Sequence, residues 1–322
     1  MSSAEGGGRI DPAKTVGGQA VLEGVMMRAP TGWSVAVRGP DGDIVGRREP
    51  LTRLSERNLG ARIPFIRGIF VLGESLTLGF KALSWSAQKA TDEEEEPLTG
   101  AQIGWTMALA FAFFAGVFIL LPALAAGFFA GESGIWFNVL EGLMRLGLFI
   151  GYIWAIGRSK EIARVFEYHG AEHMSIHAYE AGKPLSIDSV AQYPPEHPRC
   201  GTSFLLIVVL GSIIFFSFFG VPGILFLFVS RLIGIPIIAG FAYELLRWSG
   251  TRPDGRLAQW LALPGIWLQK LTTAVPDQDQ IEVAISSLVV ALDETSYNEV
   301  VGRGDLPGTA VDVRQAVLGR ET

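Results

Sequence analysis

Two long uncharged segments dominate the pattern of hydrophobic and polar positions along the chain. Residues 104–129 contain no Asp, Glu, Lys or Arg, and neither do residues 200–230. A helix of about 20 apolar residues is enough to cross the hydrocarbon core of a bilayer. The first segment is therefore expected to be one membrane-spanning helix. Residues 135–156 are expected to be a second one, joined to the first by the short connection 130–134.

The second uncharged segment is longer than one span and is interrupted by the sequence Gly-Val-Pro-Gly at residues 220–223. We expect two helices here, residues 203–219 and 224–246, forming a second hairpin. One long proline-kinked helix is the alternative, and the basic residues argue against it. The hairpin tips hold no Lys or Arg, whereas the first hundred residues hold 12, residues 158–199 hold five, and Arg247, Arg252 and Arg256 follow the last span. Four crossings keep all of these cytoplasmic, as the positive-inside rule favours.

Shorter patterns precede the first span. Residues 34–38 and 43–47 are two strand-like runs separated by a Gly-Pro-Asp-Gly turn, which predicts a β-hairpin. The segment 17–28 ahead of them is predicted to be a packed strand and turn, and its glycines would let the backbone approach another element closely. Residues 61–90 read as an apolar helix interrupted by charges, which suits a membrane interface better than a span.

Residues 257–271, which contain Trp260 and Trp267, are expected to form another interfacial helix, and residues 281–292 a short amphipathic helix. The predicted fold class is therefore mainly α: a polytopic membrane protein with four transmembrane helices in two hairpins, a small N-terminal β-hairpin region and a cytoplasmic histidine-bearing helix. The expected parts are, in order, a disordered tail (1–15), a glycine-rich and β-hairpin region (16–60), an interfacial helix (61–90), an acidic linker (91–100), the first transmembrane hairpin (101–158), a cytoplasmic His/Cys loop (159–202), the second transmembrane hairpin (203–247), C-terminal interfacial and amphipathic helices (248–296) and a tail (297–322).

The composition agrees with a membrane protein. The 322 residues are 49% hydrophobic and 18% charged, whereas a soluble chain usually carries about 25% charged residues. A net charge of −6 gives no indication of a nucleic-acid partner. The single cysteine excludes an intrachain disulfide. Residues 1–14 lack an apolar segment, so we predict no signal peptide and expect a plasma-membrane protein with both termini in the cytoplasm.

Candidate chemistry is concentrated between the two predicted hairpins. His169, His173 and His177 follow one another at intervals of four residues, and the fourth histidine, His197, stands three residues before Cys200. A helix places the first three on one apolar face, together with Glu180, and should end near Gly182. Buried imidazoles need partners for their nitrogen atoms, and a metal ion is one such partner. The alternative is a helix of satisfied buried histidines that binds no metal.

The sequence from His169 to His173 matches the H-x-x-E-H pattern of inverted zincins, with Glu172 as the candidate general base. Two ligand sets are open. His169, His173 and Glu180 would leave a position for water, which suits hydrolysis. His169, His173, His197 and Cys200 would form a closed structural site. His177 could be a ligand, a residue supporting a ligand or a core histidine.

Imidazole combined with thiolate or carboxylate ligands favours zinc, with iron and manganese as alternatives.

A second set of polar residues lies within the predicted spans. Glu141 and Arg145 are four residues apart in the second span, and Arg231 lies in the fourth. Charges inside a bilayer are costly, so these three indicate a polar pathway, a lipid headgroup contact or a structural pair.

Five segments are long and distinctive in sequence: 17–28, 64–68, 167–173, 197–204 and 280–284. Together they resemble the bacterial YqhQ family, integral-membrane proteins of unknown function commonly labelled predicted metal-dependent enzymes. The resemblance extends over roughly residues 16–294. It implies the same histidine, glutamate and cysteine residues as a site, and it adds Gln19, Glu23 and Arg28 as candidate site members.

The sequence supports two hypotheses. The first is a multi-pass membrane metal-dependent hydrolase, with His169 and His173 as ligands and Glu172 as general base, whose substrate is a peptide or a lipid reached from the inner leaflet. The second is a non-enzymatic transporter or scaffold with a structural His/Cys site, in which the charges within the spans line a pathway or an interface. Membrane lipids are expected partners in both cases, and nucleic acid in neither.

Overall fold

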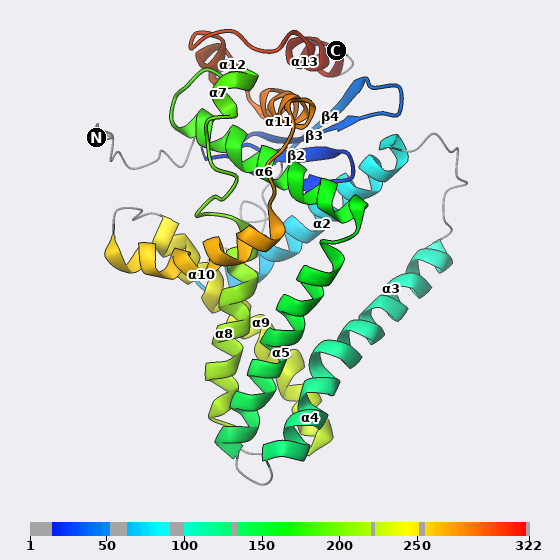
Figure 1. Ribbon diagram of the computed structural model, residues 1–322, viewed down its shortest axis with the longest axis vertical. Helices are drawn as coiled ribbons and strands as arrows, with labels where there is room; N and C mark the ends of the chain where they lie inside the picture. Colours follow the sequence, from blue (N-terminus) through cyan, green and yellow to red (C-terminus); the bar gives the residue numbers. More distant parts are fainter. Residues whose placement is uncertain are drawn as a thin grey trace.

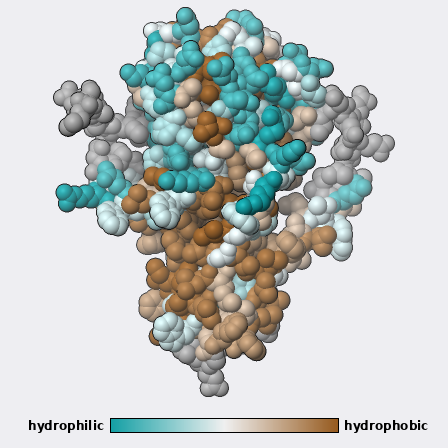
Figure 2. Space-filling model, viewed as in Figure 1, coloured by the Kyte–Doolittle hydropathy of each residue, from teal (hydrophilic) through white to brown (hydrophobic). Residues whose placement is uncertain are grey.

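The computed structural model describes residues 15–51, 63–90, 100–130, 134–219, 223–250 and 255–319. The molecule has two parts along its long axis, a cap of four strands and several helices and, below it, a bundle of long helices (Figure 1). On the face seen in Figure 2 the bundle is largely hydrophobic, whereas the cap is mostly hydrophilic. All but the last residue of the predicted acidic linker (91–100) lie outside the described residues, as do most of the predicted N-terminal tail and the tips of both hairpins.

The N-terminal strands form one antiparallel sheet in the order β1-β2-β3-β4. Their bounds are Gly17–Val21 for β1, Gly24–Arg28 for β2, Gly32–Arg38 for β3 and Ile44–Pro50 for β4. The predicted hairpin is confirmed as β3 and β4, and the predicted strand and turn at 17–28 as β1 and β2. The sequence did not predict that the two hairpins join in a single sheet.

Helices cover both faces of this sheet. Alternate residues of β2 and β3 point to opposite sides, as the two-residue period of a strand requires. Val25 and Met27 belong to the core shared with α6 (Lys160–Glu180) and α11 (Gln278–Ala291), whereas Met26 packs with Leu78 of α2 (Ile66–Ala90) on the other face. The central strands are therefore buried on both sides.

The C-terminal part differs from the prediction. The predicted amphipathic helix corresponds to α11, which is buried all round because α12 (Glu294–Val301) and α13 (Gly308–Leu318) continue the fold beyond it. The prediction of a tail over 297–322 is therefore wrong for the described residues up to 319. Ala310, Val313 and Val317 are buried at helical spacing, which gives α13 an apolar stripe. Arg314 of α13 also donates to the backbone carbonyl of Leu292, at 2.9 Å.

Among the described residues, three helices in the bundle are long and apolar enough to cross a membrane, which indicates a membrane protein. The first covers residues 104–130 and lies within α3 (Gly100–Ala115), the π-helix η3 (Gly116–Leu120) and α4 (Leu121–Ala130). The second is α5 (Gly134–Ile156). The third is residues 225–249 of α9 (Ile224–Gly250). The remaining predicted span corresponds to α8 (Gly201–Ser217), which is apolar but has only 17 residues.

Helix α6 carries the histidines across the boundary between the bundle and the cap (Figure 1). It does not continue α5, because the chain turns between Ile156 and Lys160. The predicted end is confirmed: α6 stops at Glu180, and Gly182 follows with a φ of +66°. Positive φ is a conformation that glycine adopts readily and that commonly ends helices. Helix α10 (Arg256–Thr272), the second predicted interfacial helix, lies crosswise below the cap.

Candidate metal centre

His169, His173 and Cys200 lie together where the cap meets the bundle. The two histidines are one turn apart on α6, and Cys200 is the N-cap residue of α8. One ligand atom from each lies within 4.8 Å of the other two, and in the described part of the chain this is the one group of three or more His, Cys, Asp or Glu with that spacing. His169 Nε2 is 3.2 Å from Cys200 Sγ. Nitrogen and sulfur ligands of a tetrahedral zinc ion are about 3.5 Å apart, so the three residues are spaced to share one ion.

Backbone carbonyls orient both imidazoles. His169 Nδ1 lies 2.8 Å from the carbonyl oxygen of Thr272, and His173 Nδ1 lies 2.6 Å from that of Pro195. Because a carbonyl oxygen only accepts, each Nδ1 carries a proton, and in a neutral imidazole Nε2 then has the lone pair that binds a metal. Histidines that bind metals usually donate their other N–H group in this way. The residues present therefore fit a zinc ion.

The protonation states of His173 and Cys200 also suit a ligand site. Burial lowers the pKa of His173 to about 2, and the neighbouring His169 and His197 add to this effect. The imidazole is therefore neutral across the physiological range, as a ligand must be. Burial raises the pKa of the Cys200 thiol, although hydrogen bonds with Thr202 oppose this shift. Binding of a cation would be accompanied by loss of the thiol proton.

Glu172 lies beside this group and is also buried. The backbone N–H of Gly18 in β1 hydrogen-bonds to its carboxyl group, and Oε2 has no hydrogen-bond partner among the described residues. Burial raises the pKa of Glu172 to about 8; nearby Cys200 adds to the shift, and His169 and Gly18 oppose it. A carboxyl group with a pKa near neutrality can both accept and release a proton at physiological pH.

Gly18 provides a test of this contact. A Cβ atom at Gly18 would lie 2.4 Å from the carbonyl oxygen of Met26 and 3.0 Å from Glu172 Oε1, whereas a Cβ at Gly17 would meet nothing within 4 Å. Gly18→Ala is expected to lower the free energy of unfolding by about 1–3 kcal/mol, the usual cost of overpacking. Thermal unfolding of the purified variants measures this, with Gly17→Ala as the matched control. Equal stability of the two variants would show that the backbone of Gly18 is not enclosed by Met26 and Glu172.

A second polar group adjoins the candidate ligands. The Glu180 carboxylate pairs with Arg199, and its Oε2 is 3.5 Å from His197 Nε2. The backbone N–H of His197 donates to the side-chain oxygen of Gln269 at 2.7 Å, and Gln269 donates to the His197 carbonyl at 2.9 Å. His177 Nε2 lies 2.9 Å from the carbonyl oxygen of Glu196. Burial lowers the pKa of both His177 and His197 to about 4, and in His177 the nearby His197 adds to the shift.

The structure thus assembles neither predicted ligand set completely. It places His169 and His173 with Cys200, whereas Glu180 pairs with Arg199. The His197 ring lies against His177, with ring centroids 4.3 Å apart, and its centroid is 5.7 Å from that of His173. The reason is the path of the loop from 181 to 200, which folds back along α6 and leaves Cys200 beside the first two histidines.

Comparison with known proteins assigns the chain to a family. The family described as "Protein of unknown function (DUF1385)" matches residues 63–294, more than half of the chain. The chain belongs to this family. It is also 32% identical over 297 residues to the uncharacterized protein YqhQ of Bacillus subtilis (strain 168), across 87% of this chain and 92% of that protein. The resemblance to the YqhQ family is therefore confirmed. No solved structure gives a significant match.

The three residues added by the family resemblance lie outside the metal group. A Cβ atom on Gly79 of α2 would lie 2.6 Å from Gln19 Oε1, so Gln19 packs closely against that helix. Glu23 accepts hydrogen bonds from Arg164 and Tyr168 of α6. Arg28 pairs with Glu74 of α2. Their contacts attach the sheet to the helices on its two faces.

Sequence reasoning missed Gly18, Pro195 and Thr272, which act at the site through backbone atoms. Every residue has a backbone carbonyl, so no side-chain pattern could have identified Pro195 or Thr272. The glycine-rich segment 17–28 was the one available signal, since glycine permits a close approach of the backbone.

The three charges predicted within the spans, Glu141, Arg145 and Arg231, form a separate cluster inside the bundle.

Proposed function

We propose that the protein is a membrane-embedded metal-dependent enzyme, a hydrolase that acts at the cytoplasmic face of the plasma membrane with zinc held by His169, His173 and Cys200. One observation carries the proposal: Glu172, a buried carboxyl group with a raised pKa, lies on α6 beside two imidazoles that converge on a thiol. Three protein ligands are the number typical of catalytic zinc sites, in which water or substrate would complete the ligand set.

The residues of the site would divide the chemistry between them. A zinc ion held by His169, His173 and Cys200 would supply a Lewis acid that can polarise a carbonyl or phosphoryl oxygen and activate water. Glu172 takes the proton from the attacking water and delivers it to the leaving group, and a pKa of about 8 suits both transfers near neutral pH. Thr272 and Pro195 hold the two imidazoles in the tautomer that keeps each Nε2 available as a ligand.

The proposed topology has four crossings in two hairpins, with α8 as the third crossing. Its 17 residues are at the lower end of the range for a spanning helix. Four crossings bring both termini, α6 and the metal centre to the cytoplasmic side, where the basic residues belong. Helix α10 supports a site at the membrane surface, because Leu257, Trp260 and Trp267 are exposed on it and its last residue, Thr272, holds His169. A lipid or a membrane-bound peptide would reach the site from the inner leaflet.

A non-enzymatic transporter or scaffold with a structural metal site is the second candidate. Burial favours it: His173 is 2% exposed and Cys200 is 9% exposed. Thiolate ligands are common in structural zinc sites, whose ions are closed off from substrate. In that case the charges inside the bundle, rather than the metal, would carry the function.

Glu172→Gln separates the two candidates. It keeps the shape of the side chain but removes its ability to take a proton, so we expect unchanged zinc content and turnover lower by about 10²–10⁴-fold. Because the substrate class is a lipid or a peptide, the measurement is mass spectrometry of membrane extracts from host cells that express each variant. A species that accumulates with Glu172→Gln and is consumed by the wild type is the substrate.

Glu161→Gln is the matched control, since Glu161 is exposed in the first turn of the same helix. Its extracts should match those of the wild type. If wild type and Glu172→Gln carry equal zinc and give identical extracts, the enzyme proposal fails and the structural site is supported.

A further inference from the structure

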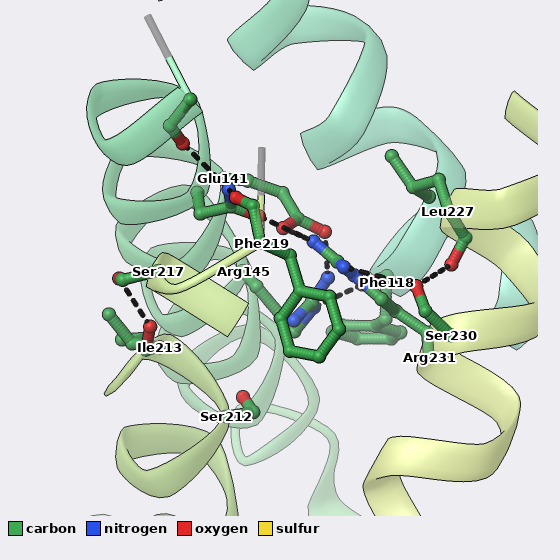
Figure 3. A network of polar contacts seen from close by, with 12 residues as sticks. Phe118, Glu141, Arg145, Ser212, Ile213, Ser217, Phe219, Leu227, Ser230 and Arg231 are labelled. Carbon is green, nitrogen blue, oxygen red and sulfur yellow. Dashed lines mark hydrogen bonds and ion pairs between the residues drawn. The ribbon is translucent and has the colours of Figure 1, made fainter. Parts of the chain in front are cut away.

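A cluster of charged residues lies inside the apolar bundle (Figure 3), and it shares no residue with the candidate metal centre. Glu141 and Arg145 come from α5, and Arg231 comes from α9. Their side chains are 1%, 10% and 0% exposed. Figure 3 shows the two guanidinium groups reaching the same carboxylate from different helices.

Glu141 bridges the two arginines. Its Oε1 pairs with Arg145, and its Oε2 lies 2.5 Å from Nη2 of Arg231. Arg231 Nη2 also donates to Asn138 Oδ1 at 2.9 Å, and its guanidinium group lies 4.0 Å from the centre of the Phe216 ring. These contacts fix the position of Arg231 deep in the bundle.

Arg145 makes a further contact with the first span. Its Nε donates to the carbonyl oxygen of Phe118 at 2.8 Å. Phe118 lies in η3, a single turn of π-helix between α3 and α4. Such turns interrupt the regular bonding of an α-helix and occur frequently at functional sites. The cluster therefore joins the first span, α5 and α9.

The charges of the cluster do not cancel. Two arginines face one glutamate, and among the described residues of α3, α4, α5, α8 and α9 the one other acidic residue, Glu244, pairs with Arg67. Arg231 Nε is buried and has no hydrogen-bond partner among the described residues. A net charge held in a low-dielectric interior without a counter-charge is strongly unfavourable. The cluster thus has one positive charge and at least one donor left for an anion.

We propose that the Arg145–Glu141–Arg231 cluster is an intramembrane binding site for one singly charged anion. The anion is either a free inorganic ion or the phosphodiester group of a lipid. It neutralises the second guanidinium and accepts from Arg231 Nε. Because the excess charge is the reason for binding, any change that makes the cluster neutral should abolish the site.

Thermal unfolding of the full chain in dodecyl maltoside tests this proposal. Gluconate, which is too bulky for the site, is replaced by chloride at constant ionic strength. When the chloride concentration is 100 times the Kd for chloride, the Tm of the protein is expected to rise by about 5 °C. Phosphatidylglycerol added in gluconate tests the lipid source. A shift with chloride alone identifies a free ion, and a shift with the lipid alone identifies a phosphodiester. The phosphorus content of the purified protein is measured, so that a lipid that copurifies is counted as bound anion.

Three variants test the charge count. Arg145→Gln leaves a neutral Glu141–Arg231 pair and should lose the shift. The double variant Glu141→Gln/Arg145→Gln keeps the positive charge and the unpartnered Nε of Arg231, and should keep the shift. Arg158→Gln is the control, because Arg158 stacks on Trp154 outside the cluster. A shift that persists in Arg145→Gln, or a phosphorus-free wild type that responds to neither anion, overturns the proposal.

Discussion

Replacing His173 with alanine is expected to remove the metal ion. The wild type should carry about one zinc ion per chain, and His173→Ala less than a tenth of that amount after dialysis. The reason is that His173 supplies one of three converging ligand atoms. Loss of a residue that only orients a ligand already weakens metal binding by about 10–100-fold, and loss of the ligand itself has a larger effect. Elemental analysis of the purified full chain measures the zinc content.

His177→Ala is the matched control for this experiment. His177 lies one turn further along the same helix, but its Nε2 faces the carbonyl oxygen of Glu196 and it lies outside the metal group. The substitution should leave the zinc content unchanged. Equal and near-zero metal in wild type and His173→Ala would rule out the metal site and leave a helix of buried, hydrogen-bonded histidines.

The sequence predicted the part of this site that depends on a single helix. Histidines at intervals of four must share a face, and Gly182 marks the end of that helix, so His169 and His173 could be placed together from spacing alone. The third member of the candidate ligand group could not be chosen between Glu180, His197 and Cys200. That choice depends on the loop before α8, whose position is fixed by contacts over long sequence distances, such as those between His197 and Gln269.

The burial of α11 was missed for a different reason. Ile281, Ala284, Ile285, Leu288 and Leu292 mark one face of the helix, whereas Ser286 and Ser287 lie on the opposite face. Both serines are buried and their hydroxyl groups are hydrogen-bonded: Ser286 Oγ donates to the Glu282 carbonyl at 2.7 Å, and Ser287 Oγ lies 3.2 Å from Ser34 Oγ of β3. Hydrogen bonds of this kind remove the cost of burying a hydroxyl group, so a polar residue type did not imply exposure.

In the bundle, the pairing of Glu141 with Arg145 follows from their spacing of four residues on one helix. The addition of Arg231 could not be predicted, since it requires α5 and α9 to lie close together at one height. The sequence shows which charged residues lie within the spans and that their burial in a membrane is costly. Only the packing of the helices shows that two arginines share one glutamate.

Glu141→Gln is expected to destabilise the protein by about 3–5 kcal/mol, the usual cost of breaking a buried ion pair by removing one partner. Without the carboxylate, Arg145 and Arg231 would face each other as two buried cations. Denaturant unfolding in dodecyl maltoside measures the effect. Glu161→Gln, on the exposed side of α6, should change the stability by less than about 0.5 kcal/mol.

The double variant Glu141→Gln/Arg231→Gln should be more stable than Glu141→Gln alone, although it carries one more substitution. Removing the second arginine relieves the repulsion that the first substitution creates, so the two effects cannot add. If the double variant instead loses the sum of the two single losses, the residues do not interact, and the bridge through Glu141 would have no energetic role in holding the three spans together.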